Sequence, residues 1–270
     1  MSHYLVSVKP PTPVTPSPAA TVVLLRDRAA DAIEVLMMQR HQKSKFAAGD
    51  FVFPGGKVEA DDNPADAVAW CRGLDLEKAA SVLGLESSPA TALGYWVGAI
   101  RETFEEVGVL LATDADGRPP RLDAARVAEY RRACQTDNRA FWTMVRAEKL
   151  MLATDRLVYF AHWVTPSDLP LRFDTRFFAA PAPQGQEPIG DEHEVIGLRW
   201  LSPREALDAH AGGEISLRYP TIRNLMLFED APSTEEALRR LQGRVVTVIQ
   251  PRVVIVDGKR KPVIPGDPGY

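Results

Sequence analysis

The sequence is poor in cysteine and lacks long apolar runs. Cys71 and Cys134 are the only cysteines in 270 residues, too few for a disulfide scaffold and without the spacing of a metal site. Both are expected to be small buried hydrophobic residues in a reducing compartment. No stretch of about 18 apolar residues and no signal-peptide core occurs, so we expect neither a membrane span nor secretion, and we expect a cytoplasmic protein.

The sequence also lacks a strong excess of either charge. Its formal net charge is −4, with 32 basic and 36 acidic residues mixed along the chain. This balance argues against a surface for nucleic acid, although a local basic pocket for one phosphorylated metabolite remains compatible with it. With 45% hydrophobic residues, the chain can bury a large core, arranged either as one elaborated domain or as two.

Residues 93–109 predict a helix with an acidic cluster. At about 100° per residue, six apolar residues form one stripe and Glu102, Glu105 and Glu106 lie opposite it. The stripe consists of Leu93, Trp96, Val97, Ile100, Phe104 and Val107. Like charges one turn apart repel by roughly 0.2–0.5 kcal/mol per pair, which a hard cation such as Mg²⁺ or Mn²⁺ would relieve. The alternative is an ordinary solvated acidic face.

The residues around this cluster favour the metal-binding interpretation. Arg101 directly precedes the acids, and Gly108 stands where a helix typically ends on glycine. Upstream, Gly55 and Gly56 form a pair that allows the backbone to approach a ligand closely.

Together these residues resemble the signature of the Nudix hydrolases. The matching positions are Gly56, Arg101, Glu102, Glu105, Glu106, Gly108 and Val109. The resemblance implies an α/β (α+β) fold in which a mixed β-sheet is sandwiched between helices. It further implies that Glu102, Glu105 and Glu106 bind Mg²⁺ or Mn²⁺, and that Arg101, Glu105 and Glu106 are catalytic.

The chain departs from this signature at three places. Asp62 stands where the family has its first glutamate, Thr103 replaces an aliphatic residue, and residues 63–100 replace a much shorter linker. Asp62 is a shorter acid than the one it replaces, so its role is left open. Thr103 lies at the edge of the apolar stripe and should be tolerated.

A second pattern resembles the coenzyme A diphosphatases within this family. Its spacing is reproduced by Leu36, Met37, Arg40, Lys45, Gly49 and Phe53–Gly56, whereas Met38, His41 and Lys45 differ from it in residue type. The resemblance implies that the substrate-binding residues are Arg40, Lys45, Gly49, Gly55 and Gly56. Lysine cannot make the two-pronged contact of arginine, which weakens the specificity argument. The alternative is a pair of solvated cations on a surface loop.

The large insertion also resembles one branch of these diphosphatases, which includes a peroxisomal enzyme. The present chain ends in Pro-Gly-Tyr rather than in the peroxisomal targeting signal Ser-Lys-Leu, so we still expect a cytoplasmic protein.

We divide the chain into a proline-rich arm at 1–18, a Nudix domain at 19–212 with an insertion at 63–92, and an extension at 213–270 packed on the core. The extension either covers the core or forms a homodimer interface.

Periodicity and turn residues predict the remaining elements. Strands are expected at 20–25, 33–39, 109–111, 156–164, 175–180, 195–201, 244–249, 252–256 and 262–264. Helices are expected at 65–72, 76–83, 122–134, 139–151, 203–210, 217–228 and 234–241. Four arginines in the helices at 122–134 and 139–151 are expected to face solvent, with a substrate contact by one of them as the alternative: Arg126, Arg131, Arg132 and Arg139. We expect His162 to be structural rather than a ligand.

The loop at 180–196 is expected to supply a further functional acid, because loops on rigid scaffolds often carry function. In many Nudix enzymes a glutamate from this region joins the metal cluster or activates water. We choose Glu192 as the general base; the other side chains available there are Glu187, Asp191, His193 and Glu194.

Three functions remain open at this stage. The first is hydrolysis of coenzyme A or acyl-coenzyme A to 3′-phospho-AMP and 4′-phosphopantetheine. The second is the same chemistry on ADP-ribose or a dinucleotide such as NADH. The third is a nucleotide-binding regulator without turnover, against which the intact set of three glutamates argues. In each case the expected partner is a small nucleotide, with neither nucleic acid nor a membrane.

Overall fold

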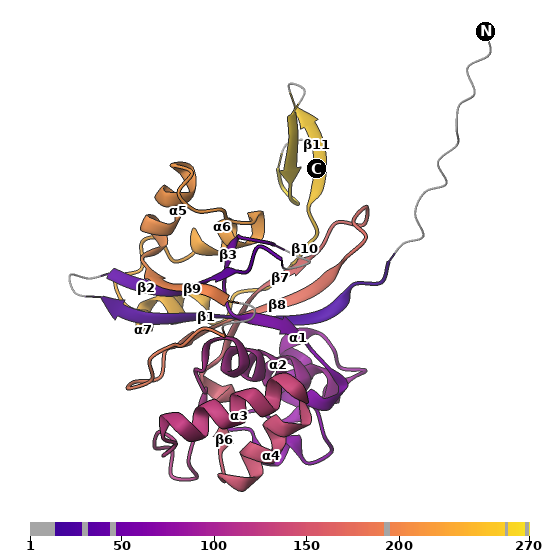
Figure 1. Cartoon of the computed structure of the whole chain (residues 1–270). Coiled ribbons are helices and arrows are strands. Elements are labelled where there is room, and N and C mark those ends of the chain that lie inside the picture. Colours follow the sequence, from indigo (N-terminus) through magenta and orange to yellow (C-terminus); the bar gives the residue numbers. More distant parts are fainter. Residues whose placement is uncertain (1–13, 29–31, 44–46, 192–194, 257–258, 268–269) are drawn as a thin grey trace.

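A mixed sheet built around strand β1 (Ser17–Arg28) forms the centre of the molecule (Figure 1). The computed structural model describes residues 14–28, 32–43, 47–191, 195–256, 259–267 and 270. β1 runs parallel to β8 (Phe173–Pro181) and antiparallel to both β2 (Ala32–Arg40) and β4 (Gly55–Lys57). β4 pairs with the first half of β1 and β2 with the second half, so the sheet divides beside β1.

The other strands extend this sheet or form small ribbons. The main strand order is β10 (Val248–Ile249), β7 (Val158–Val164), β8, β1, β2 and β3 (Phe51–Val52), with β9 (Val195–Leu201) on β2. The two ribbons pair β5 (Ala112–Thr113) with β6 (Met151–Leu152) and β11 (Arg252–Val256) with β12 (Lys259–Val263). The β11–β12 ribbon projects away from the sheet (Figure 1).

Helices cover both faces of the sheet, as the sequence predicted. α1 (Leu76–Leu83), α2 (Pro89–Val107), α3 (Ala124–Thr136) and α4 (Arg139–Ala147) lie on one face, and α5 (Pro203–Ala211), α6 (Tyr219–Leu225) and α7 (Thr234–Leu241) pack on the other. The pleat of β1 sends Val22 and Leu24 into the first core and Val23 and Leu25 into the second. The α/β sandwich is therefore confirmed.

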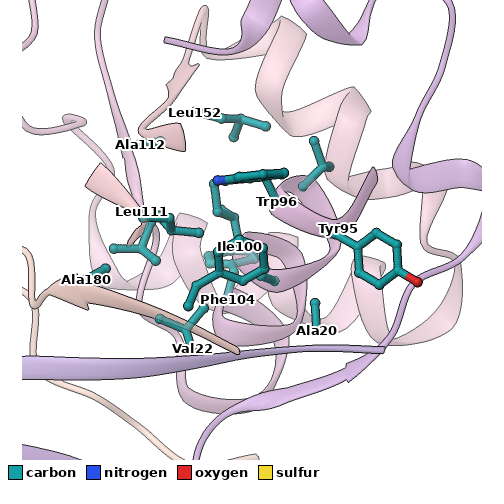
Figure 2. Packing of buried hydrophobic residues seen from close by; sticks show 14 of the residues in the cluster. Ala20, Val22, Tyr95, Trp96, Ile100, Phe104, Leu111, Ala112, Leu152 and Ala180 are labelled. Atoms are coloured by element: carbon teal, nitrogen blue, oxygen red, sulfur yellow. The ribbon is translucent and has the colours of Figure 1, made fainter. Parts of the chain in front are cut away.

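Helix α2 carries the predicted apolar stripe, and all six stripe residues are buried. Figure 2 shows Trp96, Ile100 and Phe104 of α2 packed above Ala20 and Val22 of β1. The helix starts earlier than predicted because Pro89 occupies its first turn, where proline needs no hydrogen-bond donor. Thr103 is buried, and its hydroxyl donates to the Ala99 carbonyl oxygen at 2.7 Å.

The insertion contains less helix than predicted. The helix expected at 76–83 is present as α1, but the one expected at 65–72 is only a 3₁₀ turn, η2 (Ala67–Trp70). Cys71 bridges to Leu152, and the Arg72 amide donates to the Leu152 carbonyl at 2.9 Å. These backbone contacts pull the chain into an extended conformation and end the turn. Another short 3₁₀ segment, η1 (Ala60–Asp62), leads into the insertion.

Several other boundaries differ from the predictions. The strand expected at 109–111 lies at Ala112–Thr113, because it pairs there with β6. The helix expected at 217–228 is shorter, and the strand expected at 244–249 is reduced to Val248–Ile249. Helix α7 has its predicted bounds, and the Ser233 side chain caps it by accepting from the Glu236 amide at 3.2 Å. A further short 3₁₀ turn, η3 (Thr154–Arg156), precedes β7.

The ends of the chain extend the core. β1 begins at Ser17, two residues before the start that the proline pattern suggested, and residues 1–13 lie outside the described part. From the predicted extension, Leu225, Ala237 and Leu241 contribute to the second core.

Within the described ranges, no helix combines the length and apolarity that crossing a bilayer requires.

Candidate active site

A cavity of about 960 Å³ opens where β4 lies against the second half of α2. The three acids of the predicted cluster, Glu102, Glu105 and Glu106, all line it, together with Gly55 and Gly56. The structure therefore brings the acidic helix and the glycine pair, which are far apart in sequence, to one place.

The glycine pair allows β4 to approach both β1 and α2. Gly55 has a φ of +154°, and a Cβ atom there would clash with the backbone of Ala20 and Thr21. Its amide donates to Glu106 Oε2 at 2.7 Å. A Cβ atom on Gly56 would lie 2.5 Å from the carboxyl carbon of Glu102. Gly55 thus lets β4 lie close to β1, and Gly56 leaves room for the carboxylate of Glu102.

Arg101 connects the acids and explains the role left open for Asp62. Both side chains are almost fully buried, with 2% and 1% of their surface exposed. Arg101 donates to both carboxylate oxygens of Asp62 at 2.6 and 3.0 Å, to Glu102 at 2.9 Å and to Glu105 at 3.2 Å. Its remaining donor contacts the Lys57 carbonyl at 2.9 Å. Asp62 thus fixes the guanidinium between the helix and β4.

The acidic cluster is not a solvated face. The exposed fractions of the side chains are 16% for Glu102, 12% for Glu105 and 8% for Glu106. Burial raises the pKa of Glu102 to about 7 against the opposing effect of Arg101, and the charge of Glu105 raises it further. A carboxylate in this state gains from an additional cation nearby.

The donor set fits a hard divalent cation in its chemistry. Three glutamates and the glycine segment line one cavity, and carboxylate and carbonyl oxygens are the ligands that Mg²⁺ and Mn²⁺ prefer. Among the described residues, no group of three or more acidic, histidine or cysteine side chains is already arranged to bind a metal ion. Mg²⁺ sites commonly use one or two carboxylates and complete their shell with water and substrate phosphate.

The upstream basic motif is only partly described. Arg40 lines the cavity with 21% of its side chain exposed, and its guanidinium lies 3.7 Å from Glu106. Lys45 lies outside the described residues. Gly49 does not line the cavity; with a φ of +75°, it forms the turn before β3 and its amide donates to the Arg40 carbonyl at 3.2 Å. Gly49 therefore acts on the site through the backbone of Arg40.

The loop after β8 is tied to the end of α2 by its backbone. The amides of Ile189 and Asp191 donate to the carbonyls of Val107 and Glu106 at 2.9 and 3.0 Å, and Gln186 makes two hydrogen bonds to the backbone of Leu110. Asp191 lines the cavity and Glu187 is exposed. Glu192, His193 and Glu194 fall outside the described residues. Glu192, the predicted general base, is thus the next residue in the sequence after Asp191, which lines the cavity and is hydrogen-bonded to the end of α2.

Arg131 of α3 is a site-supporting residue that the sequence analysis wrongly expected to face solvent. Only 9% of it is exposed. Its guanidinium donates to the Glu105 carbonyl at 3.0 and 3.3 Å and to the Glu106 carbonyl at 3.1 Å. Burial lowers the pKa of Arg131, while the charge of Asp191 raises it. A cation at the C-terminal end of α2 is stabilised there by the helix dipole.

Replacing Arg131 with alanine is expected to lower the free energy of unfolding by about 2 kcal/mol, because buried carbonyl groups lose charge-assisted hydrogen bonds. Arg132 is the matched control: it is the next residue on α3 and is exposed as predicted, so Arg132→Ala should change stability by less than about 0.5 kcal/mol. Urea unfolding of both variants measures the difference, and equal losses would contradict the role given to Arg131.

His162 and the cysteines have the structural environments expected of them. His162 Nε2 lies 2.6 Å from Asp174 Oδ1 across the β7–β8 pair, and Arg176 contacts both side chains. The three side chains therefore contact one another within the β7–β8 pair. Cys71 and Cys134 are buried and unpaired, and burial raises the pKa of each thiol to about 12. Such thiols are unreactive near neutral pH.

A mixed sheet between helices, with the glutamates of one helix set against a glycine pair, defines the class of the Nudix hydrolases. The family model described as the NUDT19 Nudix domain matches residues 87–227, just over half of the chain, and the chain belongs to this family. The matched segment starts just before α2 and includes the whole acidic cluster.

Two relatives and one solved structure illustrate this similarity. The acyl-coenzyme A diphosphatase NUDT19 of Xenopus laevis is 28% identical over 225 residues, covering 71% of this chain and 58% of that protein. The human protein of the same name is 25% identical, with 91% and 74% covered. A crystal structure of a NUDIX hydrolase from Alicyclobacillus acidocaldarius is 28% identical, covers 84% of this chain and 96% of its own, and superposes with a TM-score of 0.69. The aligned region is less than two thirds of the frog protein.

Proposed function

We propose that this protein hydrolyses the diphosphate linkage of coenzyme A or acyl-coenzyme A, giving 3′-phospho-AMP and 4′-phosphopantetheine or its acyl form. The observation that carries the proposal is a single cavity in which three glutamates of α2 face the glycine pair of β4 with Arg40 beside Glu106. The relatives named acyl-coenzyme A diphosphatase support the choice of substrate.

In this proposal, Glu102, Glu105 and Glu106 hold Mg²⁺ or Mn²⁺. A bound cation of this kind neutralises charge developing on phosphorus and lowers the pKa of bound water. Arg101 keeps the carboxylates of Glu102 and Glu105 oriented through the hydrogen bonds described above. Because Arg101 is itself held by Asp62, the orientation is set before substrate binds.

Arg40 and Lys45 bind the charged part of the substrate, either a diphosphate oxygen or the 3′-phosphate of the nucleotide. Gly55 and Gly56 line the cavity, and because they carry no side chain they let phosphate approach β4. The carboxylate of Glu192 accepts the proton of the attacking water, a step worth roughly 10²–10⁴-fold in rate. Asp191 is the neighbouring acid that would replace it in this role.

A direct comparison of substrates tests the proposal. Coenzyme A, dephospho-coenzyme A, ADP-ribose and NADH are assayed side by side with Mg²⁺ and with Mn²⁺, and kcat/KM is measured for each. We expect the largest value for coenzyme A and a lower one for the dephospho form, since Arg40 and Lys45 then lose a phosphate contact. Preference for ADP-ribose or NADH would replace the proposed substrate, and no turnover of any of them would favour a regulator.

A further inference from the structure

An arginine that the sequence analysis did not single out lines the same cavity as the acidic cluster. Arg218 directly precedes α6, and 53% of its side chain is exposed. Its Nε–H donates to the carboxylate of Asp50, whose own side chain is only 9% exposed. A buried carboxylate thus holds one edge of the guanidinium of a cavity-lining arginine.

The segment that carries Arg218 is fixed to the sheet by its backbone. The start of α6 lies beside β3 (Figure 1), where Leu217 forms a β-bridge with Phe51. The Phe51 amide donates to the Ser216 carbonyl at 2.8 Å. Because both its backbone and one edge of its guanidinium are held, Arg218 loses less conformational freedom when a ligand binds, which lowers the entropic cost of binding.

Arg218 and Arg40 are both hydrogen-bonded to Asp50. The Arg40 amide donates to the Asp50 carbonyl at 3.0 Å, and the Asp50 carboxylate accepts from Arg218. Arg40 is also the arginine beside the acidic cluster, 3.7 Å from Glu106, and both arginines line the cavity. A chain of contacts therefore runs from Glu106 through Arg40 and Asp50 to Arg218, which lies further along it from the predicted metal site than Arg40.

The surroundings of Arg218 suit a phosphorylated nucleoside. A guanidinium is a planar fork of N–H donors that matches the oxygens of a phosphate group. Tyr219, the next residue, also lines the cavity and meets Trp163 edge to face, with ring centroids 6.1 Å apart. Aromatic side chains are surfaces on which nucleobases stack. A phosphate donor set and an aromatic surface therefore lie next to each other in the lining.

From these contacts we infer that Arg218 binds a phosphate that the substrate carries outside its diphosphate, and that this contact determines which nucleotides the enzyme accepts. The inference rests on the proposed function, in which that group is the 3′-phosphate of coenzyme A. Arg40, beside Glu106, then contacts the diphosphate itself. ADP-ribose and NADH carry no phosphate outside the diphosphate, so they gain nothing from Arg218.

Arg204 provides a matched control for Arg218. It lies on α5 outside the cavity lining, its side chain is 61% exposed, and it too pairs with an acid, Glu229, at 2.9 Å. The experiment measures kcat/KM of the full chain for coenzyme A and for dephospho-coenzyme A, with Mg²⁺, in wild type, Arg218→Ala and Arg204→Ala. The two substrates differ only in the 3′-phosphate, so the ratio of their kcat/KM values isolates the contact with that group.

We expect Arg218→Ala to lower this ratio about tenfold or more, because a charge-assisted contact with phosphate is lost. Its kcat/KM for dephospho-coenzyme A should stay close to that of wild type, and Arg204→Ala should keep the wild-type ratio. Thermal unfolding checks that both variants are folded. If Arg218→Ala does not fold, Arg218→Lys replaces it; lysine keeps the charge beside Asp50 but not the fork, so the ratio must still fall. An equal loss for both substrates, or no change for either, overturns the inference.

Binding of nucleotides without turnover separates the inference from the proposed function. Calorimetry measures the affinities of adenosine 3′,5′-bisphosphate and of AMP for wild type and both variants. Arg218→Ala should weaken binding of the bisphosphate about tenfold or more and leave binding of AMP unchanged. If wild type cleaves neither coenzyme A compound, the proposed function fails, and this measurement alone decides the role of Arg218. The role is refuted if wild type binds both nucleotides equally well, or if Arg218→Ala binds the bisphosphate as tightly as wild type does.

Discussion

Replacing Glu106 with glutamine is expected to lower kcat by about a thousandfold or more. Glu106 lines the cavity, accepts from the Gly55 amide at 2.7 Å and has its other oxygen 3.7 Å from Arg40. Glutamine keeps the acceptor for the amide but removes the negative charge that binds a divalent cation. Loss of cation-assisted charge stabilisation is worth several kcal/mol, and each 1.4 kcal/mol is about tenfold in rate.

Glu129→Gln is the control for this prediction, since Glu129 is an exposed acid on α3 outside the cavity lining. It should retain wild-type turnover of coenzyme A. Binding of Mn²⁺, followed by calorimetry, should weaken in Glu106→Gln and stay unchanged in Glu129→Gln. Near-normal turnover in Glu106→Gln would refute the assignment of the acidic cluster as the metal site.

The second large effect concerns stability. Arg101→Met is expected to lower the free energy of unfolding of the metal-free protein by about 3–5 kcal/mol, because Asp62 then remains charged and buried without its partner. Glu102 and Glu105 lose the same guanidinium, which adds repulsion within the cluster. Urea unfolding in the presence of a chelator measures the loss, which is a large share of a typical domain's stability.

A double variant separates charge from shape. In Asp62→Asn with Arg101→Met, the buried charge is gone while the side-chain volumes are nearly kept, so part of the stability should return. Asparagine can still accept the Glu59 amide that now donates to Asp62 at 2.8 Å. If the double variant is less stable than Arg101→Met alone, the buried ion pair does not explain the effect.

The sequence predicts the centre of the site well, because local patterns encode it. The stripe of α2 follows from a 3.6-residue period, and the glycine pair follows from the need for a close backbone approach. Helix α7 was predicted to the residue because Ser233 and Glu236 form a recognisable start signal. These features depend on residues within one or two turns of each other.

Features set by distant contacts were missed. Arg131 looks like any surface arginine of a polar helix, and only the packing of α3 on the end of α2 brings it to the Glu105 and Glu106 carbonyls. The anchoring of the loop by Gln186 needs the segment around Leu110, far away in sequence. The helix expected at 65–72 did not form for the same reason, because the β-bridge between Cys71 and Leu152 overrides the local helix propensity.

The position of β1 in the sheet has a consequence for biosynthesis. This strand leaves the ribosome well before its longest pairing partner, β8, which begins only at Phe173. Until that part of the chain has been made, β1 lacks the hydrogen-bonding partner along one side and is open to wrong pairings. Topologies with such sequence-distant contacts fold slowly, so the nascent protein should depend on chaperone protection until translation has passed β8.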